Sequence, residues 1–265
     1  MQDGYEYVNR LKLEIIYSAY VELDHRWQSS NAQSGYTRLY FIRSGRGYLR
    51  RNGQVIELKP GYVYMIPAGC RFAYDCVQMS KLYFHVMLST VEGLDMLSAV
   101  QEICVLPCSE QELDKLLQYS RSDDYSDLFQ LKTYLFQTVA ACMQQHPSTT
   151  MPVRQYSALI EHAIKYIRRN TSMELSAAGI AKELFVSESR LRKSFREEIG
   201  ISLGKYIDDL VFLRAKQMLV DPTIPISKIS QRLGFCDQFY FSRRFKEMFH
   251  QTPSEFRKDS IRAKF

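Results

Sequence analysis

The sequence predicts an α+β chain of two domains. An antiparallel β-barrel with helices comes first, and an all-α domain follows in which a long helix joins two similar helical units. Short β-branched and aromatic segments separated by Gly and Pro fill residues 5–90, a pattern typical of barrels and jelly rolls. Residues 176–253 contain a helical unit that occurs twice in tandem. A polar stretch with two prolines separates the two regions, as expected for a linker.

Turn residues divide the first region into strands. We expect strands over residues 8–21, 38–43, 48–56 and 62–66. The second of these should end at Ser44-Gly45, and Asn52-Gly53 favours a type I′ hairpin turn within the third. Pro60-Gly61 marks a further turn. The barrel is therefore expected to occupy residues 1–95.

Residues 96–146 are expected to be helical, because apolar residues recur there every three or four positions. The stripe consists of Leu113, Leu116, Leu117, Leu128, Leu131, Leu135, Val139 and Cys142 or Met143. A break is expected at residues 120–124. These helices either cap the barrel or form the contact between two copies of the chain, and the pattern fits both. Residues 147–153 have little apolar content and are expected to be the linker.

An internal duplication organises the second domain, residues 154–265. An offset of 49 residues places Ile180 on Ile229, and an offset of 50 places Phe195 on Phe245. One extra residue in a turn is a small change. Each copy has a short apolar helix, a tight turn and a second amphipathic helix rich in Arg and Lys, which is the layout of a helix-turn-helix. The second helix of such a unit enters the major groove of DNA.

Capping residues indicate where these helices begin and end. Ser176 and Ser187 predict two helix N-termini in the first copy, Gly200 predicts a C-terminus, and Asp237 predicts an N-terminus in the second copy. Between the copies, a single helix is expected over residues 202–220. A helix of this length spans roughly 25–30 Å. Adjacent major-groove segments on one side of B-DNA are about 34 Å apart, so this connector suits two neighbouring subsites.

A polar and cationic row lies opposite each apolar stripe. The outward residues are Ser189, Arg192, Lys193 and Arg196 in the first copy, with Arg190 alongside, and Gln238, Phe239, Ser242 and Arg243 in the second, with Arg244 to one side. From Met151 onward, 21 Lys and Arg stand against 13 Asp and Glu, a net charge of +8, whereas the remainder has 14 against 16, a net charge of −2. A basic surface suits phosphate neutralisation. Charge alone fits a solvated basic surface equally well, and the duplication decides between the two.

The second copy carries motifs that resemble the AraC/XylS family of transcription regulators. Residues 229–235 read Ile-Ser-Gln-Arg-Leu-Gly-Phe, residues 241–246 read Phe-Ser-Arg-Arg-Phe-Lys, and residues 252–257 read Thr-Pro-Ser-Glu-Phe-Arg. The resemblance implies that the outward residues contact bases and phosphates of double-stranded DNA. It further implies a barrel that senses a small-molecule effector, often a sugar, and a homodimer formed through the helices beside the barrel. RNA polymerase is a further partner that such a regulator would meet.

Residues 61–69 resemble the second motif of cupin barrels, with five residues between Gly61 and Pro67-Ala68-Gly69. That motif carries a metal-binding His at the position of Phe72, and the chain has no His-x-His pair. A metal site needs several converging ligands, so we expect no metal and no other cofactor. An enzyme of the cupin type with an appended DNA-binding module is the alternative, and the missing ligands argue against it.

An effector site is expected among aromatic and polar residues of the barrel strands. The candidates are Trp27, Arg38, Tyr83 and His85. Aromatic faces with a few polar groups suit saccharides, but small barrels also use such side chains simply to fill their interior. Strand phase decides which residues face inward, and a shift of one residue reverses every face. Both interpretations stay open at this point.

Composition limits the remaining possibilities. The 265 residues contain six cysteines without CxxC or zinc-finger spacing, which indicates free, mostly buried thiols in a reducing cytoplasm. No apolar run of 18 residues is present, and the first residues lack a signal-peptide core. A DNA-repair protein with the same motif would need a reactive cysteine, and Cys236 is the one near the DNA-binding helices. A ligand-responsive regulator in the cytoplasm, without enzymatic activity, is the expected function.

Overall fold

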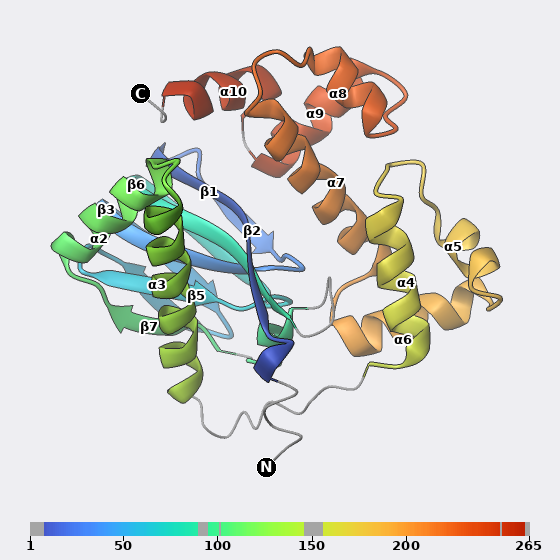
Figure 1. Cartoon of the computed structure of the whole chain (residues 1–265), viewed down its shortest axis with the longest axis horizontal. Coiled ribbons are helices and arrows are strands. Elements are labelled where there is room, and N and C mark those ends of the chain that lie inside the picture. The colour runs from blue at the N-terminus through green and yellow to red at the C-terminus, as the bar shows by residue number, and fades with distance from the viewer. Residues whose placement is uncertain (1–7, 90–94, 101, 146–155, 250, 263–265) are drawn as a thin grey trace. The chain divides into compact units, whose positions relative to one another are not determined.

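A computed structural model of the chain describes residues 8–89, 95–100, 102–145, 156–249 and 251–262. The chain forms two compact units, Met1–Arg154 and Gln155–Phe265, each with its own helices and core (Figure 1). The predicted linker, residues 147–153, lies outside the described residues. Among the described helices, none has the length and apolar character that a membrane span requires.

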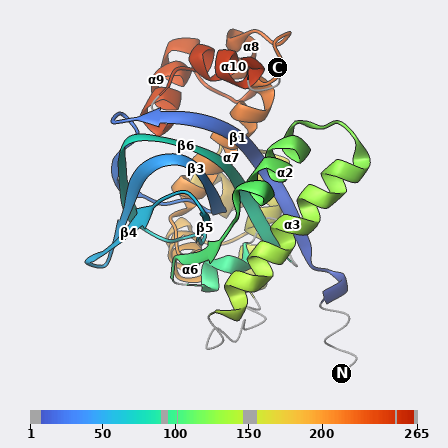
Figure 2. The same ribbon diagram turned by 90° about the vertical axis from the view of Figure 1, so that its left-hand side faces the viewer.

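The first unit is built on an antiparallel sheet. Its strands are β1 (Lys12–Asp24), β2 (Ser29–Ala32), β3 (Thr37–Arg51), β4 (Gln54–Leu58), β5 (Tyr62–Ile66), β6 (Phe72–Ser89) and β7 (Cys104–Pro107). The order is β1-β6-β3-β5-β7, with β2 also paired to β6 and β4 also paired to β3. The long strands β3 and β6 curve, as Figure 2 shows, and each therefore pairs with different strands along its length. Asn52 and Gly53 both have positive φ, as the predicted type I′ turn between β3 and β4 requires.

The predicted end of a strand at Ser44-Gly45 is wrong, because β3 continues to Arg51. Gly45 has φ +75°, and a Cβ at this position would lie 2.1 Å from the backbone oxygen of Gln78 on β6. The register of β3 on β6 shifts on both sides of this point. Gly45 therefore forms an irregularity that bends the strand without ending it.

One face of the sheet packs against helices α2 (Glu110–Arg121) and α3 (Tyr125–Gln144). The predicted break between them is confirmed, since Ser122 ends α2 and Asp124 caps α3. The prediction of helix throughout residues 96–146 is wrong at β7, which pairs with β5. Leu128 was also expected in the apolar stripe, but it is 40% exposed. A 3₁₀ helix, Met96–Ala99, precedes β7.

The second unit is helical. It consists of α4 (Ala158–Arg169), α5 (Ala177–Glu183), α6 (Glu188–Ile199), α7 (Leu203–Leu219), α8 (Ile226–Arg232), α9 (Gln238–Phe249) and α10 (Pro253–Arg262). The side chains of Ser176, Ser187 and Ser202 cap α5, α6 and α7 as hydrogen-bond acceptors. Gly200 ends α6 in the left-handed conformation. The predicted duplication thus folds as two helix pairs, α5–α6 and α8–α9, joined by α7.

The turns of the two helix pairs have the same backbone geometry. Phe185 has φ +55° after α5, and Gly234, which is 49 residues later, has φ +75° after α8. Val186 N–H donates to the carbonyl of Ala181, and the equivalent Phe235 N–H donates to the carbonyl of Ser230 at nearly the same distance. The structural repeat therefore extends through the turn, although the residue in the left-handed position differs.

Candidate functional site

The outer face of α6 is polar and exposed. The apolar stripe Leu191, Phe195 and Ile199 is buried, which turns the opposite residues towards solvent. The predicted residues Ser189, Arg190, Arg192, Lys193 and Arg196 are all exposed. Arg192 Nε donates to Glu188 Oε1 at 2.7 Å. Both side chains of this pair remain about half exposed, so the ion pair is weak and leaves the guanidinium available for another anion.

The outer face of α9 differs in chemistry. Phe241 and Phe245 are fully buried, and they orient the helix. Gln238, Phe239 and Arg243 are exposed, and Ser242 is half-buried. Phe239 is 86% exposed. Arg243 lies with its guanidinium 5.5 Å from the centroid of the Tyr240 ring, which supports the side chain without removing it from solvent.

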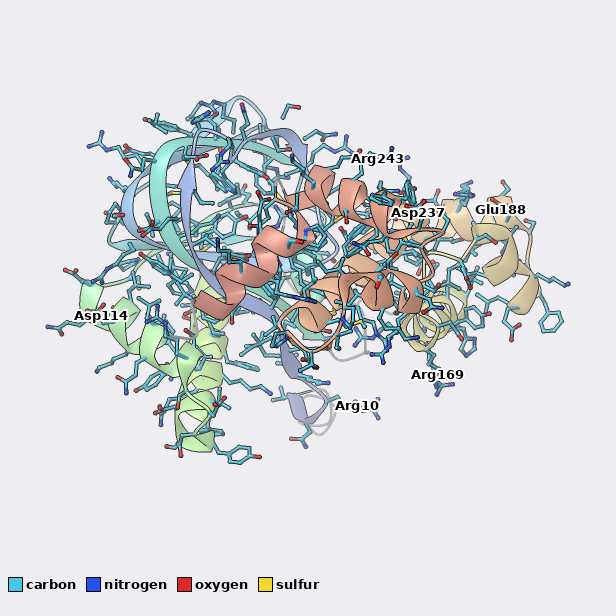
Figure 3. All side chains as sticks on the ribbon, turned by 90° about the horizontal axis from the view of Figure 1, so that it is seen from above. Arg10, Asp114, Arg169, Glu188, Asp237 and Arg243 are labelled. Carbon is cyan, nitrogen blue, oxygen red and sulfur yellow. The ribbon has the colours of Figure 1, made fainter. Side chains whose placement is uncertain are left out.

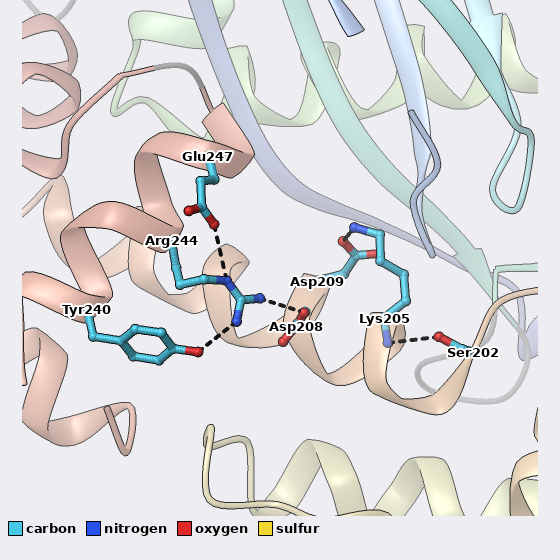
Figure 4. A network of polar contacts seen from close by, with 7 residues as sticks. All are labelled: Ser202, Lys205, Asp208, Asp209, Tyr240, Arg244 and Glu247. Atoms are coloured by element: carbon cyan, nitrogen blue, oxygen red, sulfur yellow. Dashed lines mark hydrogen bonds and ion pairs between the residues drawn. The ribbon is translucent and has the colours of Figure 1, made fainter. Parts of the chain in front are cut away.

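Arg244 occupies a different environment from the other predicted residues. Its Nη2 donates to Asp208 Oδ2 of α7 at 2.9 Å, and its Nη1 donates to the Tyr240 hydroxyl at 3.0 Å (Figure 4). Glu247 Oε2 lies 3.8 Å from Nε, and only 26% of the side chain is exposed. Arg244 thus lies to one side of the outward row, as the helical spacing predicts, and its guanidinium is held by protein partners. Its position favours a structural role that ties α9 to α7.

Figure 3 shows where the residues at the N-termini of the two helices lie in one view of the unit. In the view of Figure 3, Glu188 at the start of α6, Asp237 before α9, and Arg243 lie along one edge. Asp237 Oδ1 accepts a hydrogen bond from Tyr240 N–H at 2.7 Å, which confirms it as the cap of α9. This hydrogen bond lowers the pKa of the Asp237 carboxyl, so the cap stays ionised at the positive end of the helix.

Sequence reasoning missed Lys246, which is exposed on α9. The offset of 50 residues places Arg196 on Lys246, so the duplication itself could have identified it. With Lys246, the outward residues of α9 follow the same helical spacing as those of α6. Each helix thus presents a row that ends in a cation.

The predicted effector residues gather on the other face of the sheet in the first unit. Arg38 pairs with His85 in the register of β3 and β6, and Tyr40 pairs with Tyr83. Partners in an antiparallel ladder share a face, so these side chains lie together. Tyr83 and His85 have ring centroids 5.0 Å apart. Trp27 packs against the same apolar cluster and stacks on Tyr74 with centroids 4.2 Å apart.

Lys81 is a member of this aromatic group that sequence reasoning missed. It is 2% exposed, and its Nζ lies 3.4 Å from the Tyr40 centroid and 3.9 Å from the Trp27 centroid. Strand alternation from His85 and Tyr83 would have placed it on the same face. Burial raises the pKa of Tyr40 and, strongly, that of Tyr83, so both phenols are neutral hydroxyl groups at pH 7.

The described residues contain no group of three or more His, Cys, Asp or Glu side chains arranged to hold a metal ion. Phe72, at the position where the cupin motif carries its His, is buried in the aromatic cluster. Its ring lies 5.2 Å from the Arg38 guanidinium carbon. The cysteines are free, and five are buried whereas Cys236 is exposed.

Comparison with known proteins identifies relatives of both units. A family model described as a helix-turn-helix domain matches residues 180–259. The Msm operon regulatory protein of Streptococcus mutans is 26% identical over 233 residues, covering 83% of this chain and 84% of the relative. The lactose operon transcription activator of Staphylococcus xylosus is 26% identical over 225 residues, covering 82% of this chain and 76% of the relative. The crystal structure of ToxT from Vibrio cholerae matches with a TM-score of 0.64 at 15% identity, over 95% of this chain and 98% of that chain, and so has the same fold.

Proposed function

Because the chain belongs to the AraC/XylS family of transcription regulators, we propose that α6 and α9 read two adjacent major-groove segments of one operator. The observation that carries this proposal is the pair of exposed, cation-bearing helix faces, one on α6 and one on α9, within a single compact unit. The predicted contacts are made by Ser189, Arg190, Arg192, Lys193 and Arg196 on α6, and by Gln238, Phe239, Ser242 and Arg243 on α9, with Lys246 added.

Helix α7 is the spacer that sets the distance between the two reading helices. Its 17 residues span about 25 Å. With the widths of the two flanking helix pairs, this length suits neighbouring groove segments about 34 Å apart. The hydrogen bond of Arg244 to Asp208 and the burial of Phe212 among the rings of α9 hold α9 on the spacer. Such rigidity lets one chain recognise both subsites in a defined register.

The aromatic group of the first unit is the proposed effector site. The site combines aromatic rings with two cationic side chains. Its residues are Trp27, Tyr40, Tyr83, Arg38 and Lys81. A saccharide stacks on aromatic faces and accepts hydrogen bonds from cations and hydroxyls, which these residues supply. The name of one relative, which refers to the lactose operon, also supports a sugar. The alternative is that the rings only fill the curved sheet.

A second copy of the chain is the proposed partner of the helical face of the first unit. Tyr125, Leu128 and Phe129 at the start of α3 are 88%, 40% and 70% exposed. Adjacent exposed apolar side chains mark interaction surfaces more often than single ones do, and a two-fold pair would match an operator of repeated half-sites. Replacing Phe129 and Tyr125 by Ser should produce monomers in light scattering, whereas Val77→Ser on β6, which is 81% exposed, should not. Retained dimers would exclude this face.

The paired chain would act in the cytoplasm, where the operator lies, and would present itself there to RNA polymerase. We propose no enzymatic activity and no metal or other cofactor. The alternative of a cupin-type metal enzyme has a direct test, because stoichiometric iron, zinc or manganese in the purified chain would revive it. In that case His85 would be the first ligand to examine, since it lies in the aromatic group.

Selection from random DNA tests the central proposal. The full chain is incubated with a pool of random 40-bp duplexes, and bound sequences are enriched over several rounds. The expected result is two conserved motifs separated by about 10–11 bp, which is one helical turn. Arg243→Ala should weaken binding to the selected duplex, whereas Arg169→Ala should not, because Arg169 is exposed on α4 away from the edge that holds Arg243 (Figure 3). Absence of any enriched sequence would refute the proposal.

Thermal unfolding of the full chain with a panel of sugars tests the effector site. A binding sugar raises the unfolding temperature by mass action. Lys81→Met removes the buried ammonium group and should abolish the shift. Lys165→Met is the matched control, because Lys165 is exposed on α4. A shift that survives Lys81→Met would place the effector elsewhere.

A further inference from the structure

We propose that Phe239 reads the C5-methyl group of a thymine in the major groove and so sets a base preference at the subsite of α9. This inference rests on the proposed function, because it requires α9 to lie in the groove. It adds the chemical identity of one recognised group, which neither the fold nor the relatives specify.

The exposure of Phe239 is the first observation that supports it. The side chain is 86% exposed, although full burial of a phenyl ring is worth about 1.5–3 kcal/mol. Phe239 is the second residue of α9, which begins at Gln238. Residues in the first turn of a recognition helix are the ones that reach base edges. A large apolar ring is therefore kept in water at the position where contact with a base is expected.

The rotation of α9 about its axis holds the ring outward. Phe241 and Phe245 are 0% exposed and fix the inner face of the helix. Tyr240 receives the Arg244 guanidinium, which also reaches Asp208 on α7 (Figure 4). Turning the helix so that Phe239 packs inside would remove both phenylalanines from the core and break this network. The ring consequently remains available to a groove.

Groove chemistry then selects the partner of the ring. In the major groove, the edges of guanine, adenine and cytosine present hydrogen-bonding groups, and thymine alone adds a methyl group. A phenyl ring has no hydrogen bond to offer, so the methyl group is its complement. The flanking Gln238 and Arg243 are exposed and suit adenine and guanine, respectively. In α6 the residue equivalent to Phe239 is Ser189, so only the α9 subsite has an apolar reader.

Substitution of thymine by uracil isolates this contact, because it removes one methyl group and leaves every hydrogen-bonding atom in place. The duplex selected with the full chain is resynthesised with deoxyuridine at one thymine position at a time, and each dissociation constant is measured. We expect about a fourfold loss of affinity at one position or two adjacent positions in the α9 half of the site, the effect of losing one buried methyl group. In the Phe239→Ala chain, thymine and uracil should bind equally at those positions.

Two controls separate this contact from general damage. Phe185→Ala removes another highly exposed phenylalanine of the unit, which is 96% exposed in the turn before α6, and it should leave the uracil profile of the α9 half unchanged. Replacing the sensitive T·A pair by C·G and then methylating that cytosine at C5 should restore about fourfold in affinity to the unsubstituted chain only. Phe239→Ala should unfold at the same temperature as the unsubstituted chain, because the ring is exposed.

The outcomes are distinct from those of the proposed function. If no sequence is enriched in the selection, the proposed function fails and this inference fails with it. If a site is enriched but no thymine is sensitive to uracil, the inference alone is wrong. Sensitivity that persists in Phe239→Ala also overturns it, since another group must then contact the methyl. A uniform weakening of all probes by Phe239→Ala would instead indicate contact with the sugar-phosphate backbone and would likewise overturn it.

Discussion

Three glycines of the second unit provide a graded test of how its turns are specified. Gly204 lies in the first turn of α7, and an added Cβ would meet nothing within 4 Å. Gly200 has φ +84° and also has open space around it. Gly234 has φ +75°, and its Cβ would lie 2.1 Å from Ser172 Oγ and 3.0 Å from Glu174 Cγ. Substitution by Ala therefore adds no strain at Gly204 and backbone strain alone at Gly200. At Gly234 it adds backbone strain together with steric overlap.

The magnitudes follow from these environments. Gly204→Ala should stabilise the unit by about 0.5–1 kcal/mol, because Ala is the better helix former. Gly200→Ala should destabilise it by about 1 kcal/mol. The left-handed conformation costs an Ala residue roughly 1–2 kcal/mol, and the lower conformational entropy of the unfolded Ala chain offsets part of this cost. Gly234→Ala carries the same strain and must also displace Ser172 Oγ, which accepts a hydrogen bond from Glu174 N–H at 3.1 Å. Its total cost is expected to be about 2–4 kcal/mol.

Urea unfolding of the full chain measures the series. Circular dichroism at 222 nm follows the helices of both units, and fluorescence of Trp27, the single tryptophan, follows the first unit alone. The urea midpoint of the circular dichroism signal should rise in Gly204→Ala, fall in Gly200→Ala and fall further in Gly234→Ala. The fluorescence midpoint should stay unchanged in all three variants. Equal effects of Gly200→Ala and Gly234→Ala would refute the assigned overlap, and destabilisation by Gly204→Ala would refute the reasoning on strain.

Other changes test the site and the sheet. Arg192→Ala or Arg243→Ala should cost about 1–3 kcal/mol of binding and relax the preference at one base pair; equal loss on every sequence would indicate a phosphate contact. Binding should weaken steeply with salt as phosphates are neutralised, and a flat response would contradict the basic faces. Arg244→Ala should lower unfolding stability by about 1 kcal/mol with unchanged base preference, and an altered preference would make it a reader. Asp95→Asn should lower the free energy of unfolding, followed by tryptophan fluorescence, by about 1–3 kcal/mol. The Asp95 carboxylate accepts a hydrogen bond from Thr37 N–H at 2.9 Å, and an amide group in its place would set one N–H donor against another. An unchanged free energy of unfolding would show that this hydrogen bond does not stabilise the first unit.

Features set by neighbours in the sequence could be predicted. Ser176, Ser187 and Gly200 all cap helices in the structure as expected, because a cap depends on a side chain and backbone groups within four residues. The hairpin turn at Asn52 and Gly53 is equally local. The apolar stripes of α6 and α9 likewise follow from helical periodicity alone, and they predicted the exposed faces of both helices except at Ser242, which is half-buried.

Features set by distant pairing could not be predicted. Strand β7 is four residues long and lies in a segment with helical character on both sides, and only its pairing with β5, about 40 residues earlier, makes it a strand. The continuation of β3 past Gly45 depends on the close approach of Gln78. Local propensity is a weak guide to such segments, because tertiary context overrides it.

The environment of Arg244 illustrates the same limit within the site. Helical spacing places Arg243 and Arg244 on adjoining sides of α9 and cannot distinguish a free guanidinium from a paired one. The distinction comes from Asp208 on α7, which is 36 residues earlier. Conversely, Lys246 was available to sequence reasoning through the duplication. Comparison of equivalent positions in the two copies thus adds an exposed cation to the outer face of α9 that the helical wheel of that copy did not single out.

The two turns indicate what enforces the duplicated geometry. Glycine favours the left-handed position after α8, but Phe185 adopts it after α5, at a cost of roughly 1–2 kcal/mol for an L-residue. Its ring is 96% exposed, so packing of that side chain does not offset the cost. The compensation must come from the helices on either side, whose inward residues Ile180 and Leu191 are 0% exposed. Helix packing therefore enforces the turn in the first copy, which is why apolar periodicity located this helix-turn-helix even though its turn lacks a glycine.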